Sequence, residues 1–217
     1  MFQHVNPNKA TGPDNITPRV LKACAEQLAY IFCIIFNACF STNTVPTTWK
    51  TACTVPIPKR PVISSMNDLR PVALTSAVMK VCERAVLCMK KLVKDYIDPL
   101  QFAYRKNRST NDAILYSLED IYSHLEKTGN TVRLIFFDFS RAFNTIQPDL
   151  LVKKLLNMKL PSSVISWIFD YLTSRLQYVR LNGLLLSAIS TNTGAPQGTV
   201  LGPFLFALYT TLMIHVL

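Results

Sequence analysis

One stretch, Thr131 to Ile146 (TVRLIFFDFSRAFNTI), constrains the fold most, because a single carboxylate interrupts a run of large apolar side chains. Val132 to Phe137 has the β-branched and aromatic residues of a strand covered on both faces, so we expect a buried strand. An ionised carboxylate at its end carries a desolvation penalty unless it reaches solvent, a cation or several donors. Asp138 is therefore either a metal ligand or a cap of the following turn.

The residues after Asp138 complete a recognisable order: apolar strand, Asp138, short turn, Phe143, and then a helical pattern opened by Pro148 and Asp149. This order resembles motif A of the reverse transcriptases, most closely those of non-LTR retrotransposons. The resemblance implies that Asp138 holds catalytic magnesium through its side chain and Phe139 through its carbonyl. It also implies that Phe143 is the steric gate beside the sugar. A rigid aromatic there excludes a 2′-hydroxyl, so the implied product is DNA. Without the other motifs, Phe143 would be a core aromatic next to Phe139.

A second motif, GAPQGTVLGPFLFALY, runs from Gly194 to Tyr209. Its glycines and prolines predict a tight loop before an apolar helix, which by itself is an ordinary strand-to-helix connection. The sequence is closely similar to motif B of the reverse transcriptases. That resemblance implies that Gln197 touches the incoming nucleotide and template region, while Gly198 lets the backbone approach closely. Gly202 departs from the family, which usually has Ser before this proline, and it weakens the start of the helix.

Two cations lie on adjoining extended segments. Thr48 to Lys59 has β-prone pieces broken by prolines, as an edge strand and loop would be. Further on, Pro71 biases Arg70 toward an extended conformation. In reverse transcriptases, matching basic residues of the fingers grip the incoming triphosphate, so the resemblance implies this role for Lys59 and Arg70.

The charge balance predicts an anionic partner. Twenty-three Lys and Arg against thirteen Asp and Glu give a formal charge of +10, which favours nucleic acid or an anionic membrane surface. The best nucleic-acid candidate is the segment QFAYRKNRST, where cations that neutralise phosphates alternate with aromatics that stack on bases. It also resembles the template-contacting stretch of the family. The template-binding residues expected there are Phe102, Tyr104, Arg105, Lys106 and Arg108.

A helical pattern from Ser76 to Tyr96 supplies a second basic surface. Its apolar side consists of Val78, Cys82, Ala85, Met89, Leu92 and Tyr96, and its opposite side carries Lys80, Arg84, Lys91 and Lys94. The cationic stripe is either a solvated face or a phosphate contact, and we assign Lys80 and Arg84 to template binding.

The remaining patterns predict a helix-rich α+β fold with a small antiparallel sheet. Thr17 and Pro18 open a helix that continues through Phe40. Its apolar face comprises Leu21, Cys24, Leu28, Ile31, Ile35 and Cys39. Ser109 or Thr110 caps another helix, with Ile114, Leu118, Ile121 and Leu125 on one face. Further helices are expected at Pro148 to Lys159 and Ser162 to Leu172, and a hairpin at Leu176 to Asn192 with Asn182-Gly183 as its turn. By the resemblance, residues 1–130 are fingers-like and residues 131–217 a partial palm without a thumb.

The cysteines and the chain ends bear on location. Six cysteines without a C-x-x-C pair, together with three histidines, make zinc binding unexpected and indicate reduced thiols of an intracellular protein. Met1 to Ala10 lacks the features of a secretory signal, and the nucleus and the cytoplasm are not distinguished.

The apolar run Val200 to Leu217 has the length of a membrane helix. Pro203 and the motif B resemblance favour a palm helix instead, so no membrane insertion is expected.

Activity is the open question. Two-metal phosphoryl transfer needs several carboxylates converging on the ions, which the family draws from motif A and from a later Tyr/Phe-Ala-Asp-Asp hairpin, motif C. This sequence has no Asp or Glu after Asp170 and ends in TTLMIHVL. Asp14, Asp149 and Asp170 could substitute by composition alone. We therefore expect a truncated RNA-directed DNA polymerase domain that is inactive as this chain. The family implies an RNA template, a DNA primer, a deoxynucleoside triphosphate and Mg²⁺, with Mg²⁺ binding by this chain in doubt. The alternatives are a non-catalytic nucleic-acid-binding relic and a membrane-attached scaffold.

Overall fold

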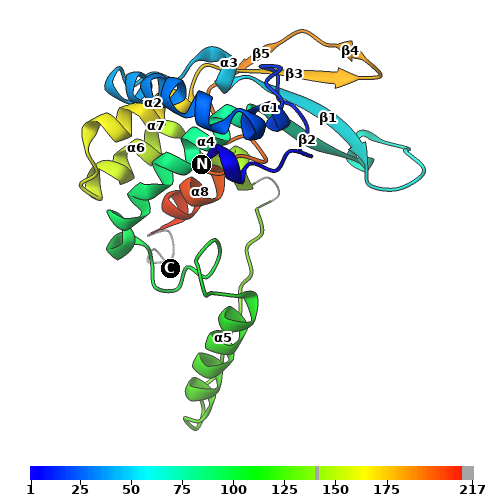
Figure 1. The fold of residues 1–217 in the computed structure, drawn as a ribbon. Coiled ribbons are helices and arrows are strands. Elements are labelled where there is room, and N and C mark those ends of the chain that lie inside the picture. Colours follow the sequence, from blue (N-terminus) through cyan, green and yellow to red (C-terminus); the bar gives the residue numbers. More distant parts are fainter. Residues whose placement is uncertain (140–141, 212–217) are drawn as a thin grey trace.

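A helical body carries a small sheet on one side, and one helix projects from the body as an arm (Figure 1). The computed structural model describes residues 1–139 and 142–211. The helices of the body are α1 (Pro18–Ala23), α2 (Ala25–Ser41), α3 (Thr47–Lys50), α4 (Ala77–Val86), α6 (Pro148–Asn157), α7 (Ser162–Leu172) and α8 (Gly202–Thr210). Short 3-10 helices are η1 (Phe2–His4), η2 (Met66–Asp68), η3 (Leu87–Lys91), η4 (Lys94–Tyr96) and η5 (Ala142–Thr145). The arm is α5 (Thr110–Leu125) with the segment that returns from it.

The sheet is mixed rather than antiparallel. Its strands are β1 (Ala52–Pro58), β2 (Leu69–Thr75), β3 (Arg175–Leu181), β4 (Leu184–Leu185) and β5 (Ile189–Thr191). The order is β2-β1-β3-β4, with β5 also on β3, and β1 pairs with β3 in parallel. The first strand is therefore central, and the prediction of an edge strand is wrong. Its prolines are tolerated because β3 pairs only with Ala52 to Thr54, so Pro56 and Pro58 lie beyond that ladder.

Signals carried by neighbouring residues are confirmed. Thr17 accepts the N–H of Val20 at 3.2 Å and opens α1, and Ser109 forms a capping box with Asp112 at the start of α5. Helices α6 and α7 lie where they were predicted. The hairpin turn has φ of 50° at Asn182 and 81° at Gly183, as such a turn requires.

The helix predicted from Pro18 to Phe40 is divided at Cys24 into α1 and α2, and its buried face differs from the predicted one. Phe32 and Phe36 are buried, whereas Ile31 is 52% exposed. The two phenylalanine rings pack against each other and against Trp49, with centroid separations of 5.7 to 6.3 Å. Large aromatic rings remove more apolar area from water than an isoleucine does, so they decide which face turns inward.

The helix predicted from Ser76 to Tyr96 is also shorter. α4 ends at Val86, and η3 and η4 follow it. Val78, Cys82 and Met89 are buried as expected, but Leu92 is 58% exposed. The change of helical period after Val86 rotates later side chains away from the predicted line.

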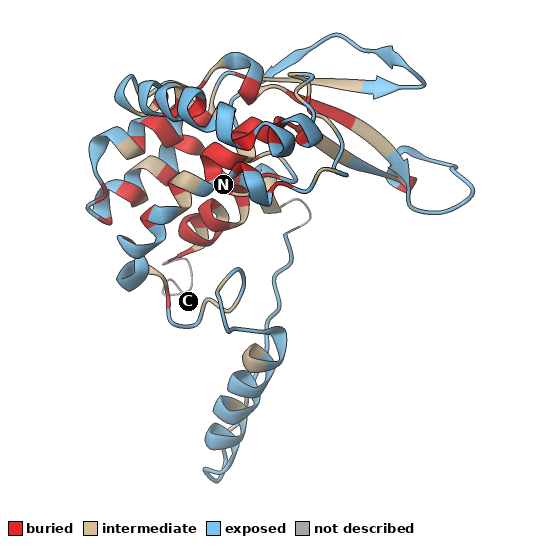
Figure 2. Cartoon of the chain, in the orientation of Figure 1, coloured by how far each residue is buried: buried red, intermediate tan, exposed pale blue. Residues whose placement is uncertain are grey.

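The core lies between α4, α6, α7 and α8, and Figure 2 shows the buried residues concentrated in this body. The largest fully buried side chains include Met79, Leu151, Leu155, Trp167, Tyr171, Leu205 and Leu208. None of the helices formed by residues 1–139 and 142–211 combines the length and the apolar character needed to span a lipid bilayer. Residues 212–217 of the C-terminal apolar run lie outside the described residues.

The arm contradicts two predictions. Residues 131–139 form no strand, and Ile135 and Phe136 are 76% and 88% exposed. The predicted apolar face of α5 is open as well, since Ile114 and Leu118 are 52% and 41% exposed. A strand exists only where another strand completes its hydrogen-bond ladder, and within the described ranges no strand pairs with this segment. β-propensity alone therefore did not produce a buried strand.

Candidate nucleotide and nucleic-acid site

The loop from Gly194 to Leu201 lies against the segment that follows the predicted metal ligand. The N–H of Gly194 donates to the carbonyl of Ile146 at 2.7 Å, and the N–H of Ala195 donates to that of Phe143 at 2.8 Å. Gly194 has φ of 75°, and an added Cβ would lie 2.9 Å from Cα of Asn144. Only glycine fits this position. The two motifs, about fifty residues apart in sequence, thus meet through backbone contacts.

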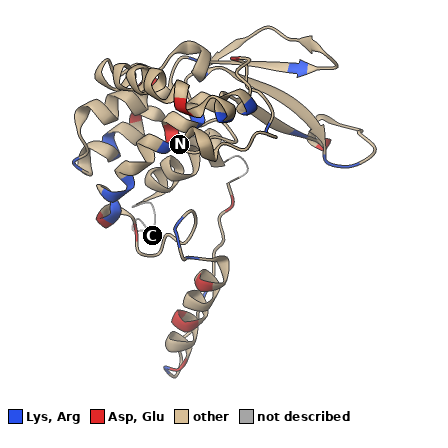
Figure 3. Cartoon of the chain, in the orientation of Figure 1, with Lys and Arg blue, Asp and Glu red and all other residues tan. Residues whose placement is uncertain are grey.

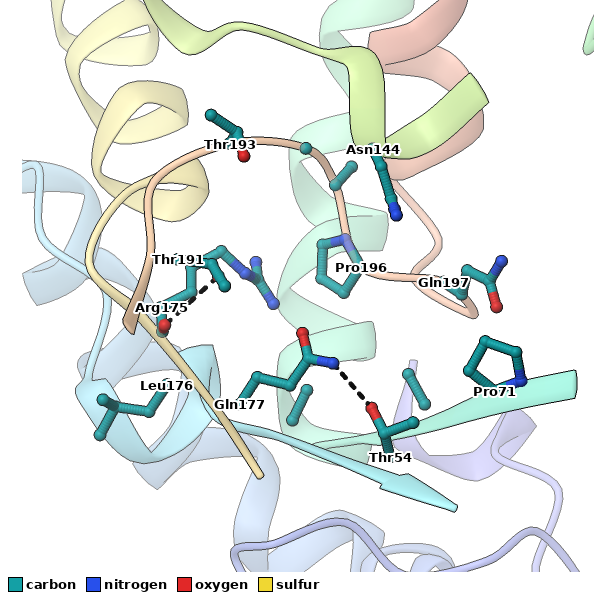
Figure 4. A pocket seen from close by; sticks show the side chains of 14 residues that line it. Thr54, Pro71, Asn144, Arg175, Leu176, Gln177, Thr191, Thr193, Pro196 and Gln197 are labelled. Atoms are coloured by element: carbon teal, nitrogen blue, oxygen red, sulfur yellow. Dashed lines mark hydrogen bonds between the residues drawn. The ribbon is translucent and has the colours of Figure 1, made fainter. Parts of the chain in front are cut away.

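A polar cavity of about 220 Å³ lies beside this loop, between it and the sheet (Figure 4). The sheet contributes Thr54, Pro71, Arg175, Gln177 and Thr191, and the opposite wall contributes Asn144, Pro196 and Gln197. Gln177 donates from Nε2 to Thr54 Oγ1 at 3.0 Å, which holds its amide across two strands. The cavity therefore offers amides, hydroxyls and one guanidinium to a ligand, and Gln197, the predicted nucleotide contact, lines it.

Gly198 has φ of 79°, which L side chains rarely adopt. A Cβ there would lie 3.5 Å from the carbonyl oxygen of Ala73 on β2. The loop thus passes beside the strand that carries Arg70. The contact of Gly198 with nucleotide stays a prediction.

The predicted steric gate belongs to an aromatic cluster. The ring centroid of Phe143 lies 5.7 Å from that of Phe206 on α8 and 6.1 Å from that of Tyr104. Phe139 packs edge-on against the same Phe206 ring at 5.8 Å. Phe143 therefore packs as a core aromatic, because its ring contacts Phe206 and Tyr104. This packing is compatible with the predicted role as a steric gate. Tyr104, a predicted template contact, thus lies beside Phe143.

Asp138 is exposed, and the described residues do not fit a two-metal site by themselves. Nowhere in ranges 1–139 and 142–211 do three His, Cys, Asp or Glu side chains come close enough to share a metal ion. The turn that Asp138 would cap includes residues 140 and 141, which lie outside the described part.

Two of the three carboxylates that could substitute for a second metal ligand make contacts elsewhere in the fold. Asp14 accepts the hydroxyl of Ser76 at 2.5 Å and the N–H of Ile16 at 3.3 Å. Asp170 accepts the N–H of Val45 at 2.7 Å and pairs with Lys50 at 3.0 Å. Both carboxylates therefore join segments of the fold. Asp149, in the first turn of α6, is exposed.

Lys59 and Arg70 lie toward the outer end of the β1–β2 hairpin. Arg70 is exposed and stands opposite Ile57, next to the cavity residue Pro71. Lys59 is exposed and donates from Nζ to the carbonyl of Asn67 at 2.8 Å. Pro71 and Ala73 of β2 line the cavity, and because side chains alternate along a strand, Arg70 lies on the opposite face of β2. Neither Lys59 nor Arg70 is among the residues that line the cavity.

The basic loop before α5 is partly occupied by its own contacts. Arg105 donates to the carbonyls of Asp98 and Pro99 at 2.9 and 3.3 Å, so it supports the loop backbone. The guanidinium of Arg108 lies 5.4 Å from the ring centroid of Phe102. Lys106 is exposed. Figure 3 shows the cations spread over the body, the hairpin loop and this segment rather than gathered in one patch.

Lys80 and Arg84 lie on α4, where a third cation joins them. Burial lowers the pKa of Lys80, and the charges of Lys9 and Arg84 lower it further, while Glu83 opposes them. Lys9 is near because Gly12 packs tightly on the start of α4, where an added Cβ would lie 2.7 Å from the carbonyl of Thr75. Lys80 is half-buried and Arg84 exposed.

The structure also adds residues that the sequence analysis missed. Glu83 is fully buried, and Arg175 is 5% exposed and lines the cavity. One signal could have located Glu83: it lies four residues after Met79 and three before Val86, which places it on the buried side of α4.

The comparisons with known proteins identify the family of the chain. Residues 57–217 match the family described as reverse transcriptase (RNA-dependent DNA polymerase). This is more than half of the chain, and the chain belongs to that family. The prediction of a reverse transcriptase domain of non-LTR retrotransposon type is confirmed.

The relatives come from mobile elements. The chain is 26% identical over 211 residues to the probable RNA-directed DNA polymerase from transposon BS of Drosophila melanogaster, covering 93% of this chain and 22% of that protein. It is 29% identical over 208 residues to the probable RNA-directed DNA polymerase from transposon X-element of the same organism, covering 94% and 23%. The RNA-directed DNA polymerase from its mobile element jockey is 26% identical over 208 residues, covering 94% and 22%. The chain thus spans less than a quarter of these relatives.

Proposed function

We propose that this chain forms the nucleotide- and template-contacting part of an RNA-directed DNA polymerase and does not extend a primer by itself. Residues 1–130 act as fingers and residues 131–217 as the first part of the palm, with an RNA template, a DNA primer and a deoxynucleoside triphosphate as ligands. The observation that carries this proposal is the backbone contact between Gly194 and Ile146, with its neighbour from Ala195 to Phe143. It brings residues 143–146 against the loop that carries Gln197, and Asn144 and Gln197 both line the polar cavity.

For each proposed ligand, the chain has residues that would contact it. A triphosphate is anionic, and Arg70 would offer its guanidinium from β2, the strand whose residues Pro71 and Ala73 line the cavity. A sugar without a 2′-hydroxyl would lie beside the Phe143 ring, which packs against Phe206 and Tyr104. A template backbone can be neutralised by Lys80 and Arg84, and its unstacked bases can contact the aromatic residues before α5.

The proposed inactivity rests on the donor set. When bound, a divalent metal pair supplies the activation of the primer hydroxyl and neutralises the leaving pyrophosphate. Asp138 and the carbonyl of Phe139 are the groups that this chain would offer to it. One side-chain carboxylate does not satisfy two ions that each prefer several oxygen ligands.

A primed RNA template separates catalysis from binding. With Mg²⁺ and all four deoxynucleoside triphosphates, the chain should leave the primer unextended, while the same sample binds the primed template by fluorescence anisotropy. Asp138→Asn should not change the measured affinity. Primer extension that is lost in Asp138→Asn would overturn the proposed inactivity.

Salt dependence tests the template surface. Each phosphate contact contributes a slope of about −0.7 to −0.9 in a plot of log affinity against log salt. The variant Lys80→Gln/Arg84→Gln should weaken binding and reduce the slope by about 1 to 2. A control, Lys127→Gln, removes a cation that lies just after the end of α5. A wild-type affinity that is flat with salt would contradict nucleic-acid binding altogether.

A second candidate function is nucleic-acid binding without nucleotide selection. The observation that favours it is that the basic residues of α4 and of the loop before α5 belong to segments other than the one that carries Asp138. Addition of the deoxynucleoside triphosphate that matches the template decides between the two. Tighter retention of primed template, lost in Gln197→Ala, supports the polymerase proposal, whereas no effect of any nucleotide supports the second candidate.

We also propose an intracellular location for the protein. All six cysteines are free, three buried and three exposed, as suits a reducing intracellular compartment.

A further inference from the structure

Glu83 is a buried carboxylate to which hydrogen-bond donors converge. Its Oε1 accepts the hydroxyl of Tyr171 at 3.0 Å. Its Oε2 accepts the N–H of Leu201 at 3.1 Å and also that of Val200. Burial raises the pKa of Glu83, while these donors and the charge of Arg175 lower it. The two N–H groups can only donate, and Arg175 supplies a nearby positive charge, so these contacts favour the ionised form, which burial opposes.

The two backbone donors belong to the loop that lines the cavity. Thr199 closes the turn just before them, because its hydroxyl donates to the carbonyl of Pro196 at 2.9 Å and accepts the N–H of Gly202 at 3.2 Å. Val200 and Leu201 then present their N–H groups to Glu83 on α4. The loop is thus tied at both ends, to Ile146 through Gly194 and to α4 through Glu83.

Arg175 connects this carboxylate with the cavity. Its guanidinium donates to the carbonyl of Tyr171 at 3.0 Å and to that of Lys50 at 3.2 Å, and it lies 5.3 Å from the ring centroid of Tyr171. It also lines the cavity, where Figure 4 shows it facing Pro196. The cation that compensates Glu83 is therefore part of the wall opposite the loop.

We propose that Glu83 is a positioning residue that holds the second half of the Gly194–Leu201 loop and thereby sets Gln197 at the cavity. This inference deepens the proposed function and rests on it for the role of Gln197. The helix that carries the basic residues Lys80 and Arg84 on its outer side is then joined through its inner side to the nucleotide site.

The test measures the loop directly. In hydrogen exchange of the full chain, Glu83→Gln should speed exchange of the amides of Val200 and Leu201 by about 10- to 100-fold, because each loses a charged acceptor. Tyr171→Phe, which leaves the carboxylate in place, should change the same amides by less than about 3-fold. Unchanged protection of both amides in Glu83→Gln would overturn the inference.

A control variant separates positioning from general loosening. Asp170→Asn breaks the side-chain contacts of Asp170 with Lys50 and Val45, neither of which belongs to the loop or donates to Glu83. It should speed exchange around Val45 and leave Val200 and Leu201 unaffected. If Asp170→Asn loosens the loop as much as Glu83→Gln does, the effect of Glu83 is a global loss of stability and the inference fails.

Nucleotide retention distinguishes this inference from the proposed function. If the matching deoxynucleoside triphosphate raises the affinity of the wild-type chain for primed template, Glu83→Gln should reduce that gain in affinity at least 10-fold. The affinity measured without nucleotide should not change. An intact gain with a loosened loop overturns the role of Gln197. No gain in the wild type counts against the proposed function alone, while the exchange rates still decide whether Glu83 holds the loop.

Discussion

Replacing Gly194 with alanine tests whether the two motifs meet as the structure has them. The positive φ costs an L-residue about 1–2 kcal/mol. The two hydrogen bonds from Gly194 and Ala195 contribute about 0.5–1.5 kcal/mol each. The new Cβ, 2.9 Å from Cα of Asn144, adds about 1–3 kcal/mol because backbone cannot yield as a flexible side chain can. We therefore expect Gly194→Ala to be strongly destabilising.

Gly183 supplies the matched control. Its φ of 81° is similar, yet an added Cβ meets nothing within 4 Å. Gly183→Ala should cost only the backbone part, about 1–2 kcal/mol. The excess at Gly194, about 2–6 kcal/mol, then measures the contact between the loop and residues 143–146. Urea unfolding followed by the fluorescence of the buried Trp49 and Trp167 gives both free energies. Equal losses in the two variants would refute the argument.

Three further predictions test the core, a thiol and the arm. Leu155→Ala should lower the free energy of unfolding by about 2–5 kcal/mol, and a loss below about 1 kcal/mol would contradict its complete burial. Burial raises the pKa of Cys82 to about 12, so iodoacetamide at pH 8 should modify the exposed Cys88 first, as mass spectrometry can show. Early labelling of Cys82 would argue against the packing of α4. Phe136→Asp should change the free energy of unfolding by less than about 0.5 kcal/mol while reducing self-association in light scattering. A large loss of stability would mean that the predicted buried strand exists after all.

The family and the local structure could be predicted from the sequence. The helix caps at Thr17 and Ser109 and the turn at Asn182-Gly183 depend on side chains within three residues of each other. Such local contacts form whatever the tertiary structure around them, so they can be predicted without it. Motifs A and B identified the family for a related reason, since their residues are contiguous.

The tertiary structure alone decided which predicted surfaces are buried. The run before Asp138 has the composition of a buried strand, but burial needs a second strand from elsewhere, and the described residues supply none there. The central place of β1 follows from its parallel pairing with β3, about 120 residues later. The role of Glu83 likewise depends on distant partners, because Val200, Leu201 and Tyr171, which donate to it, lie far from it in sequence. Sequence patterns report what a residue prefers; which partners reach it depends on segments far away in the chain, and those partners decide the site.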